Sequence, residues 1–280
     1  MKIGMNLLLW TTHVTSEQDG VIDQLKAIGF DTIEVPVFNT EDIQSYKELG
    51  ARLRGLGLDA TAVTVCSPEA NPISPDKAVR DAAVAHLTKV LDCCAAFDCK
   101  ILCGPIHSAL GHFSGAAPTE DEFKAGVETL QRVAEIAKAR DIRLAVEYLN
   151  RFENYFLTTA AATARFVKAV NHPNCKMMYD SFHAHIEEKS QPGAIASCIS
   201  EVIHAHVSEN DRGIPGTGQV DWEGYFSGLK NGGFKGCYMI EAFGRALPDL
   251  AAATKVWRDL FSDAMGLCKD GYRFIDSSIR

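Results

Sequence analysis

The chain has 280 residues and a formal net charge of -8, from 28 basic and 36 acidic residues. This length is sufficient for one barrel domain or two small domains, and the negative charge argues against broad binding to a nucleic-acid backbone. Hydrophobic residues make up 46% of the chain, yet no uncharged apolar run is long enough for a membrane-spanning helix. We therefore expect a large apolar core and neither a nucleic-acid nor a membrane partner.

The amino terminus and the cysteines bear on the compartment. The first residues, MKIGMNLLLW, have the pattern of a short strand, with no small-residue cleavage site after them, which favours a cytoplasmic location. Nine cysteines, an odd number, occur without any C-x-x-C pair. We expect reduced thiols in the core, such as Cys93 and Cys94 in a helical stretch, and no zinc knuckle.

Strand-like and helix-like segments alternate along the whole chain. Apolar segments that predict strands are residues 2–9, 31–38, 60–66, 100–106, 143–149, 176–180, 202–207 and 236–243. Segments with helical periodicity and capping signals are residues 16–29, 40–57, 76–98, 119–141, 160–170, 191–199, 221–230 and 247–265. A short tail is expected after the last of these helices.

This alternation indicates a parallel sheet covered by helices. Eight strand–helix units fit a (β/α)8 TIM barrel, which typically has about 250 residues, with residues 1–280 as a single domain. A doubly wound open sheet is the alternative fold. It would need a glycine-rich phosphate loop after the first strand, and the sequence MNLLLWTTH contains none.

Four consecutive strands in the second half of the chain end in a side chain of metal-ligand type. These are Glu147, Asp180, His206 and Glu241. Because the carboxyl ends of barrel strands face one mouth, we expect the four to meet there. Three carboxylates and one imidazole form an oxygen-rich set that suits Mn²⁺, Mg²⁺ or Co²⁺. Any one acid alone could be a salt-bridge partner or a helix cap, but four in succession would require a repeated coincidence.

The other histidines have different expected places. His204 precedes His206 by two residues and shares its strand face, so it is expected behind the ligand or in a hydrogen-bonded layer. His183 follows the sixth strand, in the loop above it, and could reach a substrate oxygen. His107 and His112 follow the fourth strand. Their side chains could line the pocket or face solvent, and the sequence does not decide between these two placements.

Seven stretches of the chain resemble the ketose 3-epimerase family, which includes the D-tagatose and D-psicose 3-epimerases. They are SPDKAVRD (74–81), VEYLNRFEN (146–154), YDSFHAHIEE (179–188), HAHVSENDRG (204–213), PGTGQVDW (215–222), IEAF (240–243) and VWRDL (256–260). The resemblance implies a xylose isomerase-like barrel and one divalent metal, Mn²⁺ first and Co²⁺ or Mg²⁺ as alternatives, bound by Glu147, Asp180, His206 and Glu241. It also implies substrate contacts from Glu153, His183 and Arg212, and a homodimer or homotetramer.

The activity that the resemblance implies is epimerisation of a free ketose at C3, with D-tagatose, D-fructose, D-psicose or ribulose as candidate substrates. Glu147 and Glu241 would serve as base and acid on the two faces of a cis-enediolate. From the residues alone, Arg212 could equally form a loop salt bridge and Glu153 could be a surface acid. The family pattern DTFHMNIEE reads DSFHAHIEE here, and MEPF reads IEAF, which leaves the choice of ketose open.

Three other functions are consistent with parts of the sequence. An aldose–ketose isomerase, acting on a sugar or hydroxypyruvate, would use similar groups between C1 and C2. A phosphodiesterase of the endonuclease IV type would need more histidine ligands, several zinc ions and a basic groove. A sugar-binding protein without activity would not need the full set of acids. The loop GIPGTG (213–218) could form a phosphate nest, so phosphorylated sugars also stay open.

Overall fold

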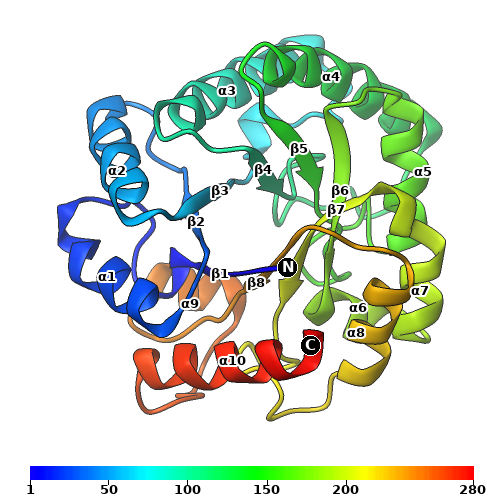
Figure 1. Ribbon diagram of the computed structural model, residues 1–280. Helices are drawn as coiled ribbons and strands as arrows, with labels where there is room; N and C mark the ends of the chain where they lie inside the picture. The colour runs from blue at the N-terminus through cyan, green and yellow to red at the C-terminus, as the bar shows by residue number, and fades with distance from the viewer.

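The computed structural model describes residues 1–280 as eight parallel strands that close into a barrel, with helices around the outside (Figure 1). The strands are β1 (Lys2–Asn6), β2 (Thr32–Pro36), β3 (Asp59–Val63), β4 (Ile101–Gly104), β5 (Arg143–Val146), β6 (Cys175–Asp180), β7 (Val202–Val207) and β8 (Cys237–Ile240). Each strand pairs in parallel with the next, and β1 pairs with β8 to close the ring. The predicted TIM barrel is therefore confirmed.

The helices fill the outer layer. They are α1 (Asp19–Ile28), α2 (Ile43–Leu56), α3 (Lys77–Ala96), α4 (Glu120–Lys138), α5 (Ala160–Val170), α6 (Ser181–Glu187), α7 (Gln191–Cys198), α8 (Trp222–Asn231), α9 (Pro248–Thr254) and α10 (Ala264–Ile279). Polar caps explain several of the starts: Thr119 and Glu122 form a capping box at α4, which typically contributes about 1 kcal/mol. None of the helices combines the length and the apolar run that a bilayer crossing requires.

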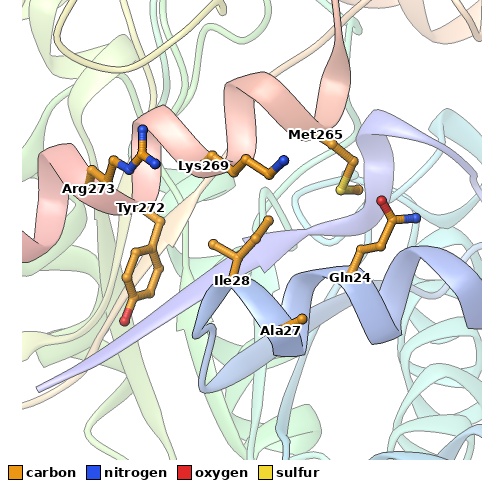
Figure 2. A pocket seen from close by; sticks show the side chains of 7 residues that line it. All are labelled: Gln24, Ala27, Ile28, Met265, Lys269, Tyr272 and Arg273. Carbon is orange, nitrogen blue, oxygen red and sulfur yellow. The ribbon is translucent and has the colours of Figure 1, made fainter.

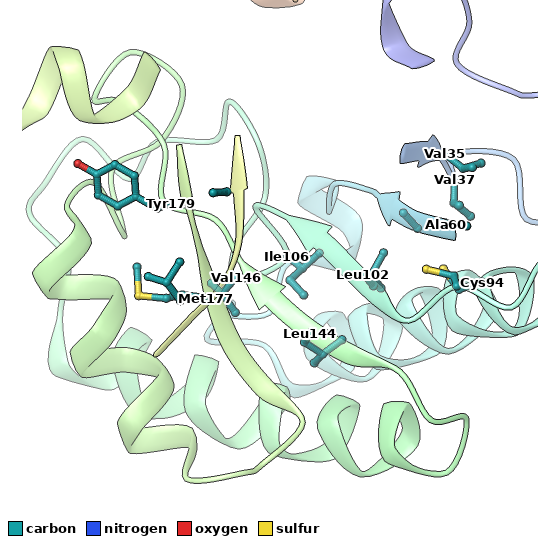
Figure 3. Close-up of a cluster of buried hydrophobic side chains, with 14 of the residues drawn as sticks. Val35, Val37, Ala60, Cys94, Leu102, Ile106, Leu144, Val146, Met177 and Tyr179 are labelled. Atoms are coloured by element: carbon teal, nitrogen blue, oxygen red, sulfur yellow. The ribbon is translucent and has the colours of Figure 1, made fainter. Parts of the chain in front are cut away.

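Two groups of apolar side chains pack against the two faces of the barrel wall. Successive strand residues face opposite sides, and those facing outward pack under the helices, as Figure 3 shows for Leu102, Leu144, Val146, Met177 and Tyr179. Those facing inward form a smaller cluster together with side chains from beyond the strand ends. Its members are Leu8, Val63, Ile101, Cys103, Ala145, Met178, Phe243 and Val256. Because both faces are covered, the strands read as continuous apolar runs. All nine cysteines are buried and unpaired.

The strands end earlier than the sequence predicts. β5 stops at Val146 and β8 at Ile240, so Glu147 and Glu241 are each the first residue beyond a strand. The first predicted strand, residues 2–9, turns into the 3-10 helix η1 (Leu7–Leu9). This turn forms because the Asn6 side chain accepts a hydrogen bond from the Leu8 amide at 2.8 Å.

Two predictions about the helices are wrong. The closing helix predicted at residues 247–265 is two helices, because Lys255 adopts a left-handed φ of 61° that ends α9, and Asp263 caps α10. The expected tail is thus mostly helix, and α10 buries Leu267 and Ile275. His183 does not lie in a loop: it belongs to the short helix α6, whose first amides donate to the Asp180 carboxylate.

Gly104 at the end of β4 provides a test of the barrel wall. Its φ is +119°, and a Cβ there would lie 2.1 Å from the Thr64 carbonyl oxygen. We expect Gly104→Ala to lower the free energy of unfolding by about 2–4 kcal/mol. Gly55→Ala, in α2 with nothing within 4 Å, should instead raise it by up to about 1 kcal/mol. Urea unfolding of both variants checks this, and equal shifts would contradict the role given to Gly104.

Candidate active site

The barrel brings the four predicted ligand residues to its carboxyl-terminal mouth. Asp180 and His206 are register partners on β6 and β7. The Glu147 amide donates to the Gly104 carbonyl, and the Glu241 amide donates to the Val207 carbonyl, so both glutamates continue the inward-facing side of their strands. All four residues are 5% exposed or less.

Within this group, His206 lies between two carboxylates. Its Nδ1 is 3.4 Å from Asp180 Oδ2 and 3.4 Å from Glu241 Oε1. Potential ligand atoms of these three residues lie within 4.8 Å of one another, and the same holds for Glu147, Asp180 and His183. Asp180 thus belongs to both sets and links Glu147 to the other residues.

The donor set fits a divalent cation. Asp180 Oδ2 and His206 Nδ1 are buried and have no hydrogen-bond partner within the protein. A buried polar atom without a partner typically costs about 1–3 kcal/mol, and a cation that accepts electron pairs from both atoms would remove this cost. Carboxylate oxygens with one imidazole suit Mn²⁺, Mg²⁺ or Co²⁺.

Behind the cluster lies a buried carboxylate that the sequence analysis did not single out, Glu34 on β2. Its two oxygens lie 2.7 Å from His206 Nε2 and 2.8 Å from His204 Nε2. They also accept hydrogen bonds from Asn6, Thr61 and Cys103. Because the Glu34 carboxylate can only accept a hydrogen bond, His206 donates to it through Nε2. This contact orients the ring so that Nδ1 faces Asp180 and Glu241. The sequence contains one signal for the role of Glu34, because it is an acid inside the otherwise uncharged strand TIEVP.

The charges shift one another's protonation. Burial, together with Glu241, raises the pKa of Glu147 well above its usual value. Burial also acts to raise the pKa of Asp180, but His183, His206 and Arg212 hold it below the ordinary range. Against the effect of burial, Glu34 and Glu241 raise the pKa of His206 well above its usual value. The site therefore favours positive charge at His206 Nδ1.

His183 is directed into the site by a backbone contact. Its Nδ1 accepts a hydrogen bond from the Asn150 amide at 3.0 Å, so the proton of the neutral ring is on Nε2. That Nε2 lies 3.5 Å from Glu147 Oε1 and 3.4 Å from Arg212 Nη2. Burial lowers the pKa of His183, which keeps the ring neutral and able to donate.

Arg212 is held on every side. Its guanidinium donates to Glu241 and to Ser208, and Nη1 lies 3.8 Å from Asp180 Oδ2. It packs 3.6 Å from the ring centre of Phe182, a cation–π contact that also fixes its plane. The residue is 4% exposed and has a φ of +67°. Arg212 is therefore not a surface loop salt bridge.

A cavity of about 350 Å³ opens above the cluster. Glu147, Glu153, His183, Arg212 and Glu241 line it, and the Glu153 carboxylate accepts from the Asn150 side chain at 2.7 Å. The two histidines after β4 are not among its lining residues. His107 is fully buried, which lowers its pKa to about 3, and His112 is exposed.

A second hollow lies in the outer helical layer, between α1 and α10 (Figure 2). It measures about 580 Å³, and Lys269 and Arg273 of α10 line it opposite Gln24 and Ile28 of α1. Its seven lining residues include no acid, histidine or cysteine. The chemistry-bearing side chains thus gather at the barrel mouth and not in this groove.

TIM-barrel enzymes have their active sites at the carboxyl ends of the barrel strands. The buried acids and imidazoles at this end place the protein in the class of TIM-barrel enzymes. The family model described as xylose isomerase-like TIM barrel matches residues 22–262. A D-psicose 3-epimerase of Ruminiclostridium cellulolyticum is 33% identical over 94% of this chain and 91% of its own. The chain belongs to the xylose isomerase-like TIM barrel family and, within it, to the ketose 3-epimerases, which are isomerases.

Solved structures agree with this assignment. A structure of L-ribulose 3-epimerase superposes with a TM-score of 0.94 at 28% identity, covering 99% of this chain and 94% of that one. A D-psicose 3-epimerase from Clostridium cellulolyticum, solved with D-tagatose, gives a TM-score of 0.89 at 31% identity, covering 99% and 98%. Both the fold and the resemblance stated from sequence motifs are thereby confirmed.

The contact between Glu34 and the two histidines can be tested through stability. In Glu34→Gln the amide nitrogen would face a histidine N–H, so one donor stays unpaired in a buried place. We expect the free energy of unfolding to fall by about 3 kcal/mol. Glu41→Gln is the matched control, because the Glu41 side chain is 78% exposed and pairs only with Lys89. Urea unfolding should show little change for it. Equal stability of the two variants would contradict the role of Glu34.

Proposed function

We propose that the protein is a metal-dependent enzyme that epimerises free ketoses at C3. The observation that carries this proposal is the pair Glu147 and Glu241, which extend from β5 and β8 into one buried cavity and flank Asp180 and His206. The names of the relatives support it, since they act on D-psicose and L-ribulose. These sugars, together with D-tagatose and D-fructose, form the proposed substrate group.

The proposed metal ligands are Glu147, Asp180, His206 and Glu241, with Mn²⁺ as the first candidate ion and Co²⁺ or Mg²⁺ as alternatives. Support comes from the two unpartnered buried atoms of Asp180 and His206 and from the carboxylate behind the imidazole. When bound, the ion supplies a Lewis acid that stabilises negative charge on the substrate oxygens at C2 and C3.

The proton steps are assigned to the two glutamates. One carboxylate removes the C3 proton, and the other returns a proton on the opposite face of the carbon. The pKa of Glu147 is raised, which moves this group toward the range in which a carboxylate is an effective base near neutral pH. The roles exchange with the direction of reaction, so the epimerisation is reversible.

Three further side chains are proposed to hold the sugar. The Nε2–H of His183 and the guanidinium of Arg212 donate toward the C2 oxygen, where negative charge develops. Glu153 accepts a hydrogen bond from a hydroxyl at the same end of the sugar. Support for this assignment is that all three line the cavity and that His183 and Arg212 are 3.4 Å apart.

The charges of the cavity favour an unphosphorylated sugar. Arg212 is the only lysine or arginine that lines the cavity, and it already pairs with Glu241. The remaining charged residues there are acids, including Asp249 at the rim. A phosphate dianion would meet repulsion without a free cation to compensate it.

For the assembly and its compartment, we propose a cytoplasmic homodimer or homotetramer. The oligomeric state rests on the family resemblance. Nine buried, unpaired thiols are typical of proteins in a reducing compartment.

The acid–base roles predict that Glu147→Gln and Glu241→Gln each lower kcat by about 10²–10⁴-fold, because a carboxamide does not exchange the proton. Chromatography of D-psicose and D-fructose after incubation with Mn²⁺ measures the turnover. Glu223→Gln, an exposed acid on α8, is the control and should retain full activity. Substantial epimerase activity in either active-site variant would remove that residue from the proton transfer, and an aldose product would indicate an isomerase instead.

Metal removal gives an independent check. Treatment with a chelator should abolish turnover, and added Mn²⁺ or Co²⁺ should restore it. Asp180→Asn should weaken Mn²⁺ binding by at least about tenfold, because one anionic ligand is lost. Electron paramagnetic resonance of free Mn²⁺ measures this affinity without an activity assay. Unchanged affinity would exclude Asp180 as a ligand.

A further inference from the structure

Two successive backbone amides after β5 are bound by side chains of one helix, α6. The Asn150 amide donates to His183 Nδ1 at 3.0 Å, and the Arg151 amide donates to Glu187 Oε1 at 2.8 Å. His183 and Glu187 are four residues apart in α6, so they lie on one face of the helix. The turn that follows β5 is therefore attached to α6 at two adjacent points, and only His183 belongs to the proposed substrate site.

The second attachment, here called the Glu187 clamp, consists of Glu187 and Arg151. In addition to the amide, the Glu187 carboxylate accepts hydrogen bonds from Arg151 Nε and Nη2, each at 3.0 Å. A bidentate contact of this kind fixes the relative geometry of the two groups. The Glu187 side chain is 7% exposed, and neither residue lines the cavity at the barrel mouth. Any effect of the clamp on the reaction must therefore pass through other residues.

The turn beside the clamp contains the substrate-facing acid Glu153. The Asn150 side chain donates to Glu153 Oε1 at 2.7 Å and accepts from the Phe152 amide at 2.9 Å. The Asn150 carbonyl accepts from the Glu153 amide at 3.0 Å. Phe152 is 72% exposed, so it gives the turn no apolar anchor. Asn150 thus connects His183 to Glu153, and the residue next to it in the chain, Arg151, is bound by the clamp.

We propose that Glu187 is a positioning residue for the epimerisation, which holds the turn at residues 150–153 on α6 and thereby directs His183 and Glu153 toward the sugar. Without this carboxylate the Arg151 amide loses its acceptor, and His183 alone holds the turn. A displacement of about 1 Å in the groups that position a substrate can cost about 10²-fold in rate. The inference rests on the proposed function and adds to it a residue outside the cavity.

Hydrogen exchange tests the clamp without an activity assay. In Glu187→Ala, the amides of Asn150 and Arg151 should exchange at least about tenfold faster than in the unsubstituted protein, because the turn is released. NMR of the Mg²⁺-loaded protein measures these rates. Glu188→Ala is the matched control, because the neighbouring acid accepts from the Ala160 amide of α5 at 2.8 Å and not from the turn. Unchanged exchange at Asn150 in Glu187→Ala would overturn the proposal.

Kinetics of D-psicose epimerisation with Mn²⁺ separate positioning from general damage. Glu187→Ala should lower kcat by about 10- to 100-fold and change KM by less than about threefold, because His183 acts on charge that develops in the transition state. Glu187→Gln keeps an oxygen for the Arg151 amide, so its kcat should stay within about fivefold of the unsubstituted enzyme. Glu188→Ala should keep full activity. A glutamine variant as slow as the alanine variant would contradict a role through this amide.

The affinity for Mn²⁺ gives a third measurement, by electron paramagnetic resonance of the free ion. Because no proposed ligand contacts the clamp, Glu187→Ala should bind Mn²⁺ within about twofold of the unsubstituted protein. A large loss of Mn²⁺ affinity would show that the substitution damages the metal site itself, and the positioning role would then be overturned.

The outcomes distinguish this inference from the proposed function. If the metal-loaded, unsubstituted protein epimerises no ketose, the proposed function fails and the role in the reaction fails with it, while the exchange rates still decide whether Glu187 holds the turn. If it epimerises ketoses and Glu187→Ala retains full kcat, the proposed function stands and the positioning role is overturned. Faster exchange at Asn150 with a low kcat that Glu187→Gln restores supports both.

Discussion

Negative charge buried inside the barrel is the constraint on which the rest of this structure depends. Glu34, Glu147, Asp180 and Glu241 all face the interior at 5% exposure or less, where an unpaired ion costs several kcal/mol. The protein pairs two of them within its own chain, Glu34 with the histidines of β7 and Glu241 with Arg212. The remaining excess of negative charge around His206 Nδ1 is what makes a cation at this place favourable.

The surrounding elements hold these charges in position by local means. The Asp180 carboxylate accepts the first amides of α6 through one oxygen and leaves the other free. The Asn150 amide holds His183, and two aromatic rings hold the guanidinium of Arg212. The left-handed backbone of Arg212 adds a conformational cost of about 1 kcal/mol or more for a residue other than glycine. Such strain persists only where the surroundings fix the residue, as the buried contacts of Arg212 do.

The barrel also divides its mouth between two kinds of chemistry. The second half of the chain contributes the charged groups, whereas the first half contributes mostly apolar residues, Leu8, Phe38, Val63, Pro105 and Leu110. Glu34 is the exception, because it lies on β2 yet reaches across the interior to His204 and His206. The two halves of the barrel are thus linked at the centre of the site.

Local sequence patterns were sufficient to predict the alternation of strands and helices and the three acids and one imidazole at the ends of β5 to β8. Both follow from local patterns. The period of the apolar residues indicates whether a segment is a helix or a strand, and residues at the carboxyl end of a barrel strand lie at the mouth of the barrel. Only the tertiary structure decided the role of Glu34, whose histidine partners lie 170 and 172 residues away. It also decided the separation of α9 from α10 and the burial of His107. These features depend on strand register and ring closure, which join distant segments, and no local pattern records which residues will face each other.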